Sequence, residues 1–170
     1  MIVAGNRLQD YRSVFGDETV DYDAALQAYH RQGPSGDWEN SFVSAYAAAH
    51  PHEDWAETFA HYLHMREGLA STDARGLQVE TELLATDPFQ GSVVSRTNDS
   101  SDGEFLENVN RWCVISRVVN ELNRSMGQPD FYPFKLSTEV VQKLHFVHRA
   151  ICNVASPPAE CPNDQFGRAS

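Results

Sequence analysis

Residues 50–64 read HPHEDWAETFAHYLH and belong to the longest helix that the sequence predicts, from Pro51 to about Ala70. Proline suits the first helical position, because its missing N–H would have no partner there. Glu53 and Asp54 follow at once, and their charges complement the positive end of the helix dipole. This segment is the clearest sign of the mainly α-helical fold that the rest of the chain also predicts.

The same helix has two chemically different sides. At about 100° per residue, a polar stripe of carboxylates and imidazoles occupies about one quarter of the circumference. Its members are Glu53, Glu57, His61 and His64. The opposite side, which we predict to face the core, carries Trp55, Phe59, Tyr62 and Leu63. A stripe of this kind can hold a metal ion, or can orient ligands that another helix holds.

Periodicity alone leaves other interpretations of the stripe open. Early acidic residues and late histidines also suit the helix dipole, and Glu57 and His61 form an ordinary i,i+4 pair on a solvated face. A zinc site made only from these four side chains is disfavoured, because ligands along one straight helix lie too far apart for a single tetrahedral ion.

The remaining chain is expected to form one helical domain over residues 1–154. Further helices are predicted over residues 6–15, 21–32, 38–49, 104–126 and 137–152. Asp21 and Ser137 suit helix starts, whereas Gly33 and Gly127 suit helix ends. Residues 71–103 are interpreted as a surface loop, and residues 155–170 as a disordered tail. No convincing strand is found.

Composition excludes several classes of function. The 170 residues carry a formal net charge of −11, which argues against binding nucleic acid or an anionic membrane surface. No stretch is long and apolar enough to span a membrane, and three cysteines without C-x-x-C favour a reducing cytoplasm. Nucleotide-binding and α/β-hydrolase motifs are absent. His145 and His148 form an H-x-x-H that we interpret as core-edge or surface residues.

Three long runs resemble a bacterial family of zinc-binding metallopeptidases. They are YRSVFGDETVDYDAAL (11–26), FVSAYAAAHPHEDWAETFAHYLH (42–64) and ELNRSMGQPDFYPF (121–134). The resemblance extends from about Leu8 to Ile151 and is weakest over 71–103. It implies the gluzincin plan, in which two histidines of an H-E-x-x-H helix and a glutamate of a later helix hold Zn²⁺.

Carried over by this resemblance, E-D-W-A-E at 53–57 corresponds to the later-helix motif. Glu53 would then be the third zinc ligand, and Glu57 a supporting carboxylate. His61 and His64 would line the cleft or pack against the zinc-binding helix. Tyr132 is a candidate oxyanion donor, with a buried structural tyrosine as the alternative. The implied cofactor is Zn²⁺, and the implied substrate is a peptide or protein.

The chain departs from the family plan in one decisive respect. It contains neither the zinc ribbon nor the H-E-x-x-H helix, and Met1 stands just after the expected end of that helix. We therefore expect an N-terminally truncated metallopeptidase domain that is inactive by itself. An open groove and exposed apolar surface should then lie beside Glu53. The alternative is a helical interaction module that has lost catalysis and has a closed core.

Overall fold

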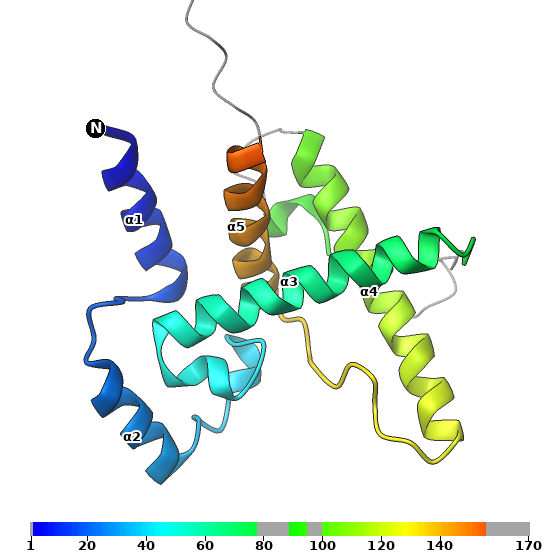
Figure 1. The fold of residues 1–170 in the computed structure, drawn as a ribbon, viewed down its shortest axis with the longest axis horizontal. Helices are drawn as coiled ribbons and strands as arrows, with labels where there is room; N and C mark the ends of the chain where they lie inside the picture. Colours follow the sequence, from blue (N-terminus) through cyan, green and yellow to red (C-terminus); the bar gives the residue numbers. More distant parts are fainter. Residues whose placement is uncertain (1, 78–88, 95–99, 156–170) are drawn as a thin grey trace, which may run out of the picture.

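The computed structural model describes residues 2–77, 89–94 and 100–155, and it is mainly α-helical over this part of the chain (Figure 1). The helices are α1 (Ile2–Phe15), α2 (Tyr22–Gln32), α3 (Pro51–Asp73), α4 (Ser100–Ser125) and α5 (Thr138–Ala155). Short 3-10 turns are η1 (Trp38–Asn40), η2 (Tyr46–Ala49) and η4 (Gly91–Val93). None of the described helices combines the length and apolarity that a membrane span requires. The predicted fold class is confirmed, whereas the predicted tail lies almost wholly outside the described residues.

Helix α3 is the central element of the fold. It packs against η2, α5, α4 and α1, and Figure 1 shows it crossing the molecule between the α1–α2 side and α4. The segment 126–137 returns from the end of α4 to the start of α5 without regular structure. This arrangement places the N-terminal half of α3 near α1, α2 and η2, and its C-terminal half against α4.

The predicted helix ends are confirmed by their hydrogen bonds and backbone angles. The Asp21 carboxylate accepts a hydrogen bond from the Ala24 N–H at 2.9 Å, and the Ser137 hydroxyl accepts one from the Val140 N–H at 3.1 Å. Gly127 ends α4 with φ at 72°, a left-handed angle that glycine adopts at little cost. Helix α3 runs three residues beyond its predicted end, to Asp73.

The helix predicted over residues 38–49 is wrong, because the chain there forms only the turns η1 and η2. Side chains occupy the backbone groups that a continuous helix would use. The Ser44 hydroxyl accepts the Ala47 N–H at 3.1 Å, and Lys143 Nζ donates to the Ser41 carbonyl oxygen at 2.6 Å. Local hydroxyl bonding of this kind competes with helix formation.

The predicted core face of α3 is only partly confirmed, because Tyr62 is buried and Trp55 and Phe59 pack against the core, whereas Leu63 does not. The buried residues of this helix are Asp54, Thr58, His61, Tyr62, Met65 and Leu69. They centre about 130° from Glu53 on the helical wheel, between the two predicted faces. Leu63 is 41% exposed, and Trp55 and Phe59 are half-buried. The apolar pattern predicted the wrong centre for the buried face, because Asp54 on the buried face belongs to an ion pair inside the core.

That ion pair joins α3 to α5. Lys143 Nζ lies 2.6 Å from Asp54 Oδ2, and both side chains are almost fully buried. The ammonium also lies 4.2 Å from the centroid of the Phe42 ring, a favourable cation–π distance. Burial raises the pKa of Asp54 to about 6, although the charge of Lys143 opposes this shift. Three elements thus meet at one buried carboxylate.

Gly68 sets the spacing between α3 and α4. A Cβ added there would lie 2.4 Å from Cζ3 of Trp112, whose ring is buried. We expect Gly68→Ala to lower the free energy of unfolding by about 1–3 kcal/mol, because overpacking outweighs the better helix propensity of alanine. Urea denaturation measures this. Gly103→Ala, where the new Cβ meets nothing within 4 Å, should change stability in the opposite direction.

Candidate metal-ligand face

Glu53 lies in the first turn of α3 and faces the start of α2. Its Oε1 accepts a hydrogen bond from the phenol of Tyr22, and this bond raises the pKa of Tyr22 to about 12. The Glu53 side chain is half-buried. Its second oxygen, Oε2, has no hydrogen-bond partner within the described residues. One oxygen is therefore fixed by α2 and the other remains available to a ligand.

Glu57 lies one turn further along and has a matching arrangement. Its Oε2 accepts a hydrogen bond from the Ser44 hydroxyl at 2.8 Å, and Oε1 has no partner in the described part of the chain. Ser44 is itself held by the Ala47 N–H, so the loop before η2 orients the carboxylate. The two glutamates thus present one free oxygen each from adjacent turns of α3.

His61 does not share the surroundings of the two glutamates. It is buried, its Nδ1 lies 3.0 Å from the Tyr132 hydroxyl, and its ring centroid lies 4.4 Å from that of Phe134. Burial lowers the pKa of His61 to about 4, although the Glu57 carboxylate opposes the shift. The ring is therefore neutral at neutral pH. His64 is exposed, with its ring centroid 6.0 Å from that of His61.

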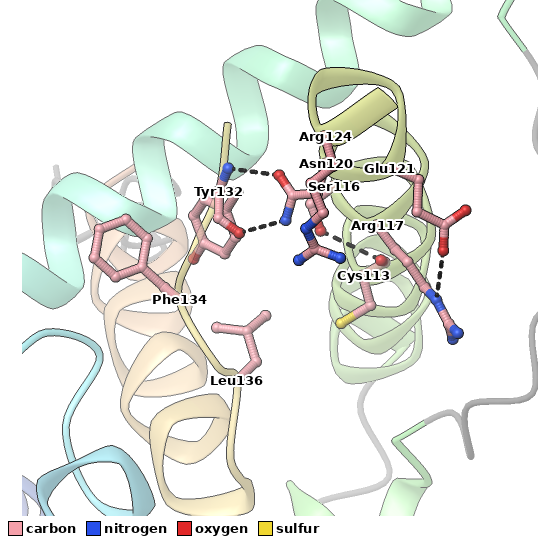
Figure 2. Close-up of a pocket in the computed structure, with 9 residues that line it drawn as sticks. All are labelled: Cys113, Ser116, Arg117, Asn120, Glu121, Arg124, Tyr132, Phe134 and Leu136. Atoms are coloured by element: carbon pink, nitrogen blue, oxygen red, sulfur yellow. Dashed lines mark hydrogen bonds and ion pairs between the residues drawn. The ribbon is translucent and has the colours of Figure 1, made fainter. Parts of the chain in front are cut away.

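Tyr132 is buried between α3 and α4 in the segment that follows α4 (Figure 2). Asn120 holds its backbone twice: the side-chain amide donates to the Tyr132 carbonyl at 2.7 Å and accepts from its N–H at 2.9 Å. Burial raises the pKa of the phenol well above its usual range. The hydroxyl thus meets His61 inside the core.

These residues do not form a complete metal site by themselves. No group of three or more His, Cys, Asp or Glu side chains within the described residues could hold a metal ion. Glu53 and Glu57 are one turn apart, whereas His61 is turned towards Tyr132 and His64 towards solvent. Two carboxylates on one helix supply at most part of a tetrahedral zinc coordination shell.

Comparison with known proteins places the chain in a family. Residues 1–150 match the family described as "Putative zinc-binding metallo-peptidase". The chain belongs to this family. It is also 38% identical over 148 residues to uncharacterised proteins of Mycobacterium bovis and Mycobacterium tuberculosis. The aligned region is 87% of this chain but only 40% of each relative. No solved structure matches significantly.

Family membership gives a context to the exposed apolar residues in the N-terminal part of the chain, one of which, Tyr22, contacts Glu53. Tyr22, at the start of α2, is 40% exposed and its phenol donates to Glu53, and Val20, two residues earlier, is 51% exposed. Leu8, on α1, is 45% exposed. Exposed apolar side chains near Glu53 were expected if a further element of the metallopeptidase docks there. Single exposed residues of this kind are common on protein surfaces.

Three other histidines have structural contacts that the sequence did not reveal. His145 Nε2 lies 2.6 Å from Asp102 Oδ1, and His148 Nδ1 lies 2.9 Å from the Tyr62 hydroxyl. His50 caps α3, because its Nδ1 accepts the His52 N–H while Nε2 donates to the Val20 carbonyl. Only the three-residue spacing of His145 and His148, which places them on one side of α5, hinted at a common environment.

The neutral state of His61 makes stability pH-dependent. The folded state binds fewer protons than the unfolded state between about pH 4 and the ordinary histidine pKa of 6.5. His61 therefore stabilises the fold fully above pH 6.5, and this contribution falls by up to about 1.4 kcal/mol per pH unit on acidification. Asp54 acts in the opposite direction between its ordinary pKa of 3.8 and about 6.

Urea unfolding at pH 7 and pH 5, for the parent chain and for His61→Gln, would measure the contribution of His61 to the free energy of unfolding. The variant should lose less stability on acidification than the parent. Burial also lowers the pKa of His148, so some acid sensitivity remains in both proteins. An identical loss in the two proteins would show that His61 titrates normally.

Proposed function

We propose that this domain supplies the glutamate side of the active site of a zinc-dependent metallopeptidase. The observation that carries the proposal is a pair of carboxylate oxygens, Glu53 Oε2 and Glu57 Oε1, which have no hydrogen-bond partner among the described residues and lie in adjacent turns of α3. Glu53 would be a zinc ligand, and Glu57 would support a neighbouring ligand. The substrate class is a peptide or protein.

Two histidines and a general base must come from outside these 170 residues, because the sequence contains no H-E-x-x-H. One glutamate does not hold zinc tightly, and without zinc and a general base no group activates the attacking water. We therefore propose that the 170-residue chain alone does not hydrolyse peptides. Tyr22, which is 40% exposed and donates to Glu53, marks where an H-E-x-x-H helix would dock.

Complementation in trans tests the proposal. A synthetic amphipathic helix that contains H-E-x-x-H is mixed with the chain, and zinc affinity is measured by competition with a chromophoric chelator. We expect the mixture to bind zinc more tightly than the peptide alone, and Glu53→Gln to remove this gain. Glu57→Gln should weaken binding by about 10–100-fold, as for other groups that orient metal ligands.

Glu67→Gln is the matched control, because Glu67 is an exposed glutamate of the same helix. It should leave zinc affinity unchanged. If Glu53→Gln and Glu67→Gln behave alike, Glu53 is not a ligand. Peptide hydrolysis by the mixture is a separate readout that zinc affinity does not determine.

A second candidate is a helical interaction module without catalysis. It is favoured by the continuous buried core and by the lack of a three-ligand cluster in the described residues. This alternative predicts that neither zinc nor the H-E-x-x-H peptide changes the melting temperature of the chain. A ligand that binds only the folded state raises it, so thermal melts distinguish the two candidates.

A further inference from the structure

A groove of about 360 Å³ lies between α4 and the irregular segment that follows it, here called the 128–137 segment. Cys113 and Leu136 form part of its apolar lining, and Figure 2 shows Leu136 turned towards α4. Its volume lies within the range of small-ligand pockets. None of the residues expected to hold metal lines it.

The backbone beside the groove has free hydrogen-bonding groups. The N–H groups of Phe134, Lys135 and Leu136 and the carbonyls of Pro133–Leu136 make no hydrogen bond within the described residues. Backbone groups without a protein partner are solvated and are ready to pair with another chain. Four successive residues with this property resemble the open edge to which an extended peptide adds.

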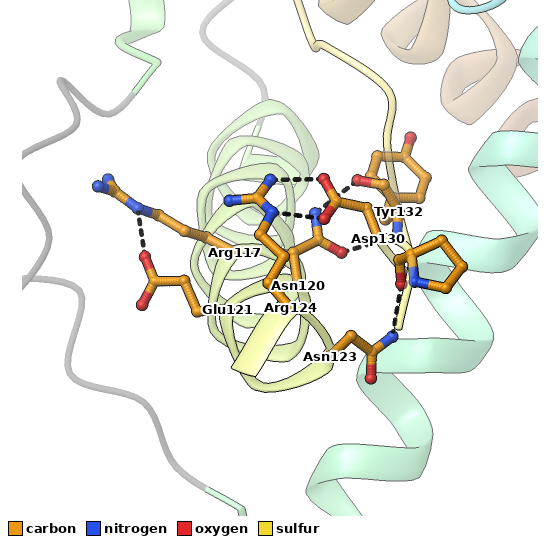
Figure 3. A network of polar contacts seen from close by, with 8 residues as sticks. Arg117, Asn120, Glu121, Asn123, Arg124, Asp130 and Tyr132 are labelled. Carbon is orange, nitrogen blue, oxygen red and sulfur yellow. Dashed lines mark hydrogen bonds and ion pairs between the residues drawn. The ribbon is translucent and has the colours of Figure 1, made fainter. Parts of the chain in front are cut away.

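The opening of the groove carries hydrogen-bond donors for peptide carbonyl oxygens. Arg124 uses Nε and Nη2 to bind Asp130, and therefore keeps the N–H groups of Nη1 (Figure 3). Arg117 makes one long contact, 3.4 Å from Nε to Glu121. A guanidinium has five N–H donors, so both arginines have donors left. Each arginine is already paired with a carboxylate, and the opening does not require a charged ligand.

Core side chains link the groove to the part of α3 that carries Glu53 and Glu57. Phe134, which lines it, packs against His61, and His61 lies one turn from Glu57 on α3. A peptide bound along the 128–137 segment would therefore contact Phe134, whose ring separates the groove from His61 on α3. This connection gives the groove a place in the proposed peptidase site.

We propose that the groove binds a peptide in extended conformation. Its main chain pairs with alternate residues of the 133–136 stretch, and one uncharged apolar side chain enters between Leu136 and Cys113. The identification of this peptide as a substrate rests on the proposed function, whereas the binding itself requires no zinc. Failure of zinc complementation would therefore leave this binding site untouched, and the reverse also holds.

The test is an NMR titration of the 170-residue chain with acetyl-Gly-Val-Leu-Val-Gly-amide at millimolar concentration. The amide signals of Phe134, Lys135 and Leu136 should shift together. The same peptide with both valines N-methylated cannot donate those backbone hydrogen bonds, and should bind about tenfold more weakly or worse. Acetyl-Gly-Ser-Gly-Ser-Gly-amide, which lacks apolar side chains, should bind more weakly still.

Leu136→Gln should weaken binding of the leucine peptide at least about fivefold, because it places an amide in the apolar lining. Leu122→Gln is the matched control, since Leu122 lies on α4, is 56% exposed and does not line the groove. Circular dichroism checks that both variants fold. Absence of shifts at 134–136 in the parent chain, or equal affinity for the N-methylated peptide, would overturn the proposal.

Discussion

Replacing Lys143 with methionine is expected to lower the free energy of unfolding by about 3–5 kcal/mol at pH 8. The substitution leaves the Asp54 carboxylate buried without its only cationic partner within the described residues, 2.6 Å away. Removing one member of a buried ion pair costs this much because the other charge stays desolvated and unpaired. Thr58, at 3.4 Å, offers Asp54 only one weak hydrogen bond.

The deficit should depend on pH in a defined direction. In the parent chain the pKa of Asp54 is about 6, above its ordinary 3.8, so its contribution to stability is fully present below pH 3.8 and is lost as the pH rises through 6. Without the lysine charge this pKa rises further. Urea denaturation should therefore show a smaller deficit for Lys143→Met at pH 5 than at pH 8.

The double variant Asp54→Asn, Lys143→Met separates charge from packing. It buries no charge, so it should recover most of the stability that Lys143→Met loses. Lys135 is the other lysine of the chain and is exposed, so Lys135→Met should change the free energy of unfolding little. A double variant as unstable as Lys143→Met would instead assign the loss to the lysine stem and its contact with the Phe42 ring.

The sequence predicted the five described α-helices, but it also predicted a helix over 38–49 that does not form and shifted the core face of α3. Caps and stops at Asp21, Gly33, Gly127 and Ser137 are local signals, and the structure confirms them. Which face of α3 is buried depends on a lysine that lies 89 residues away in the chain. A prediction from amphipathic periodicity assumes that charged residues are exposed. The buried ion pair of Asp54 with Lys143 breaks this assumption, and nothing in the sequence around Asp54 indicates it.

The candidate site shows the same limit. Helical spacing correctly grouped Glu53 and Glu57 on one side of α3, since neighbouring turns fix their relative position. It also grouped His61 with them, but Tyr132 and Phe134, which precede α5, cover that ring. The donors to the two glutamates, Tyr22 and Ser44, come from irregular or preceding elements whose approach to α3 no periodicity encodes.

Replacing Asn120 with alanine is the second large effect that the structure predicts. It should lower the free energy of unfolding by about 2–5 kcal/mol, because it leaves both the N–H and the carbonyl of buried Tyr132 without partners. The same change removes the two hydrogen bonds that hold Tyr132 to α4, although Arg124 still binds Asp130 at the start of the 128–137 segment. Urea denaturation gives the stability loss, and NMR titration of His61 gives an independent readout.

The pKa of His61 distinguishes a local movement of the 128–137 segment away from α4 from a general loss of stability. Tyr132 and Phe134 bury the His61 ring, so freeing their segment hydrates the ring and should move the pKa of His61 up from about 4. Asn123 lies on the same helix as Asn120, and Asn123→Ala removes one exposed 3.2 Å hydrogen bond to the Pro129 carbonyl. It should lower the free energy of unfolding by at most about 0.5 kcal/mol and leave the pKa of His61 unchanged. Equal losses for the two asparagine variants would mean that Tyr132 is held by its ring contacts. The peptide groove would then need another source of rigidity.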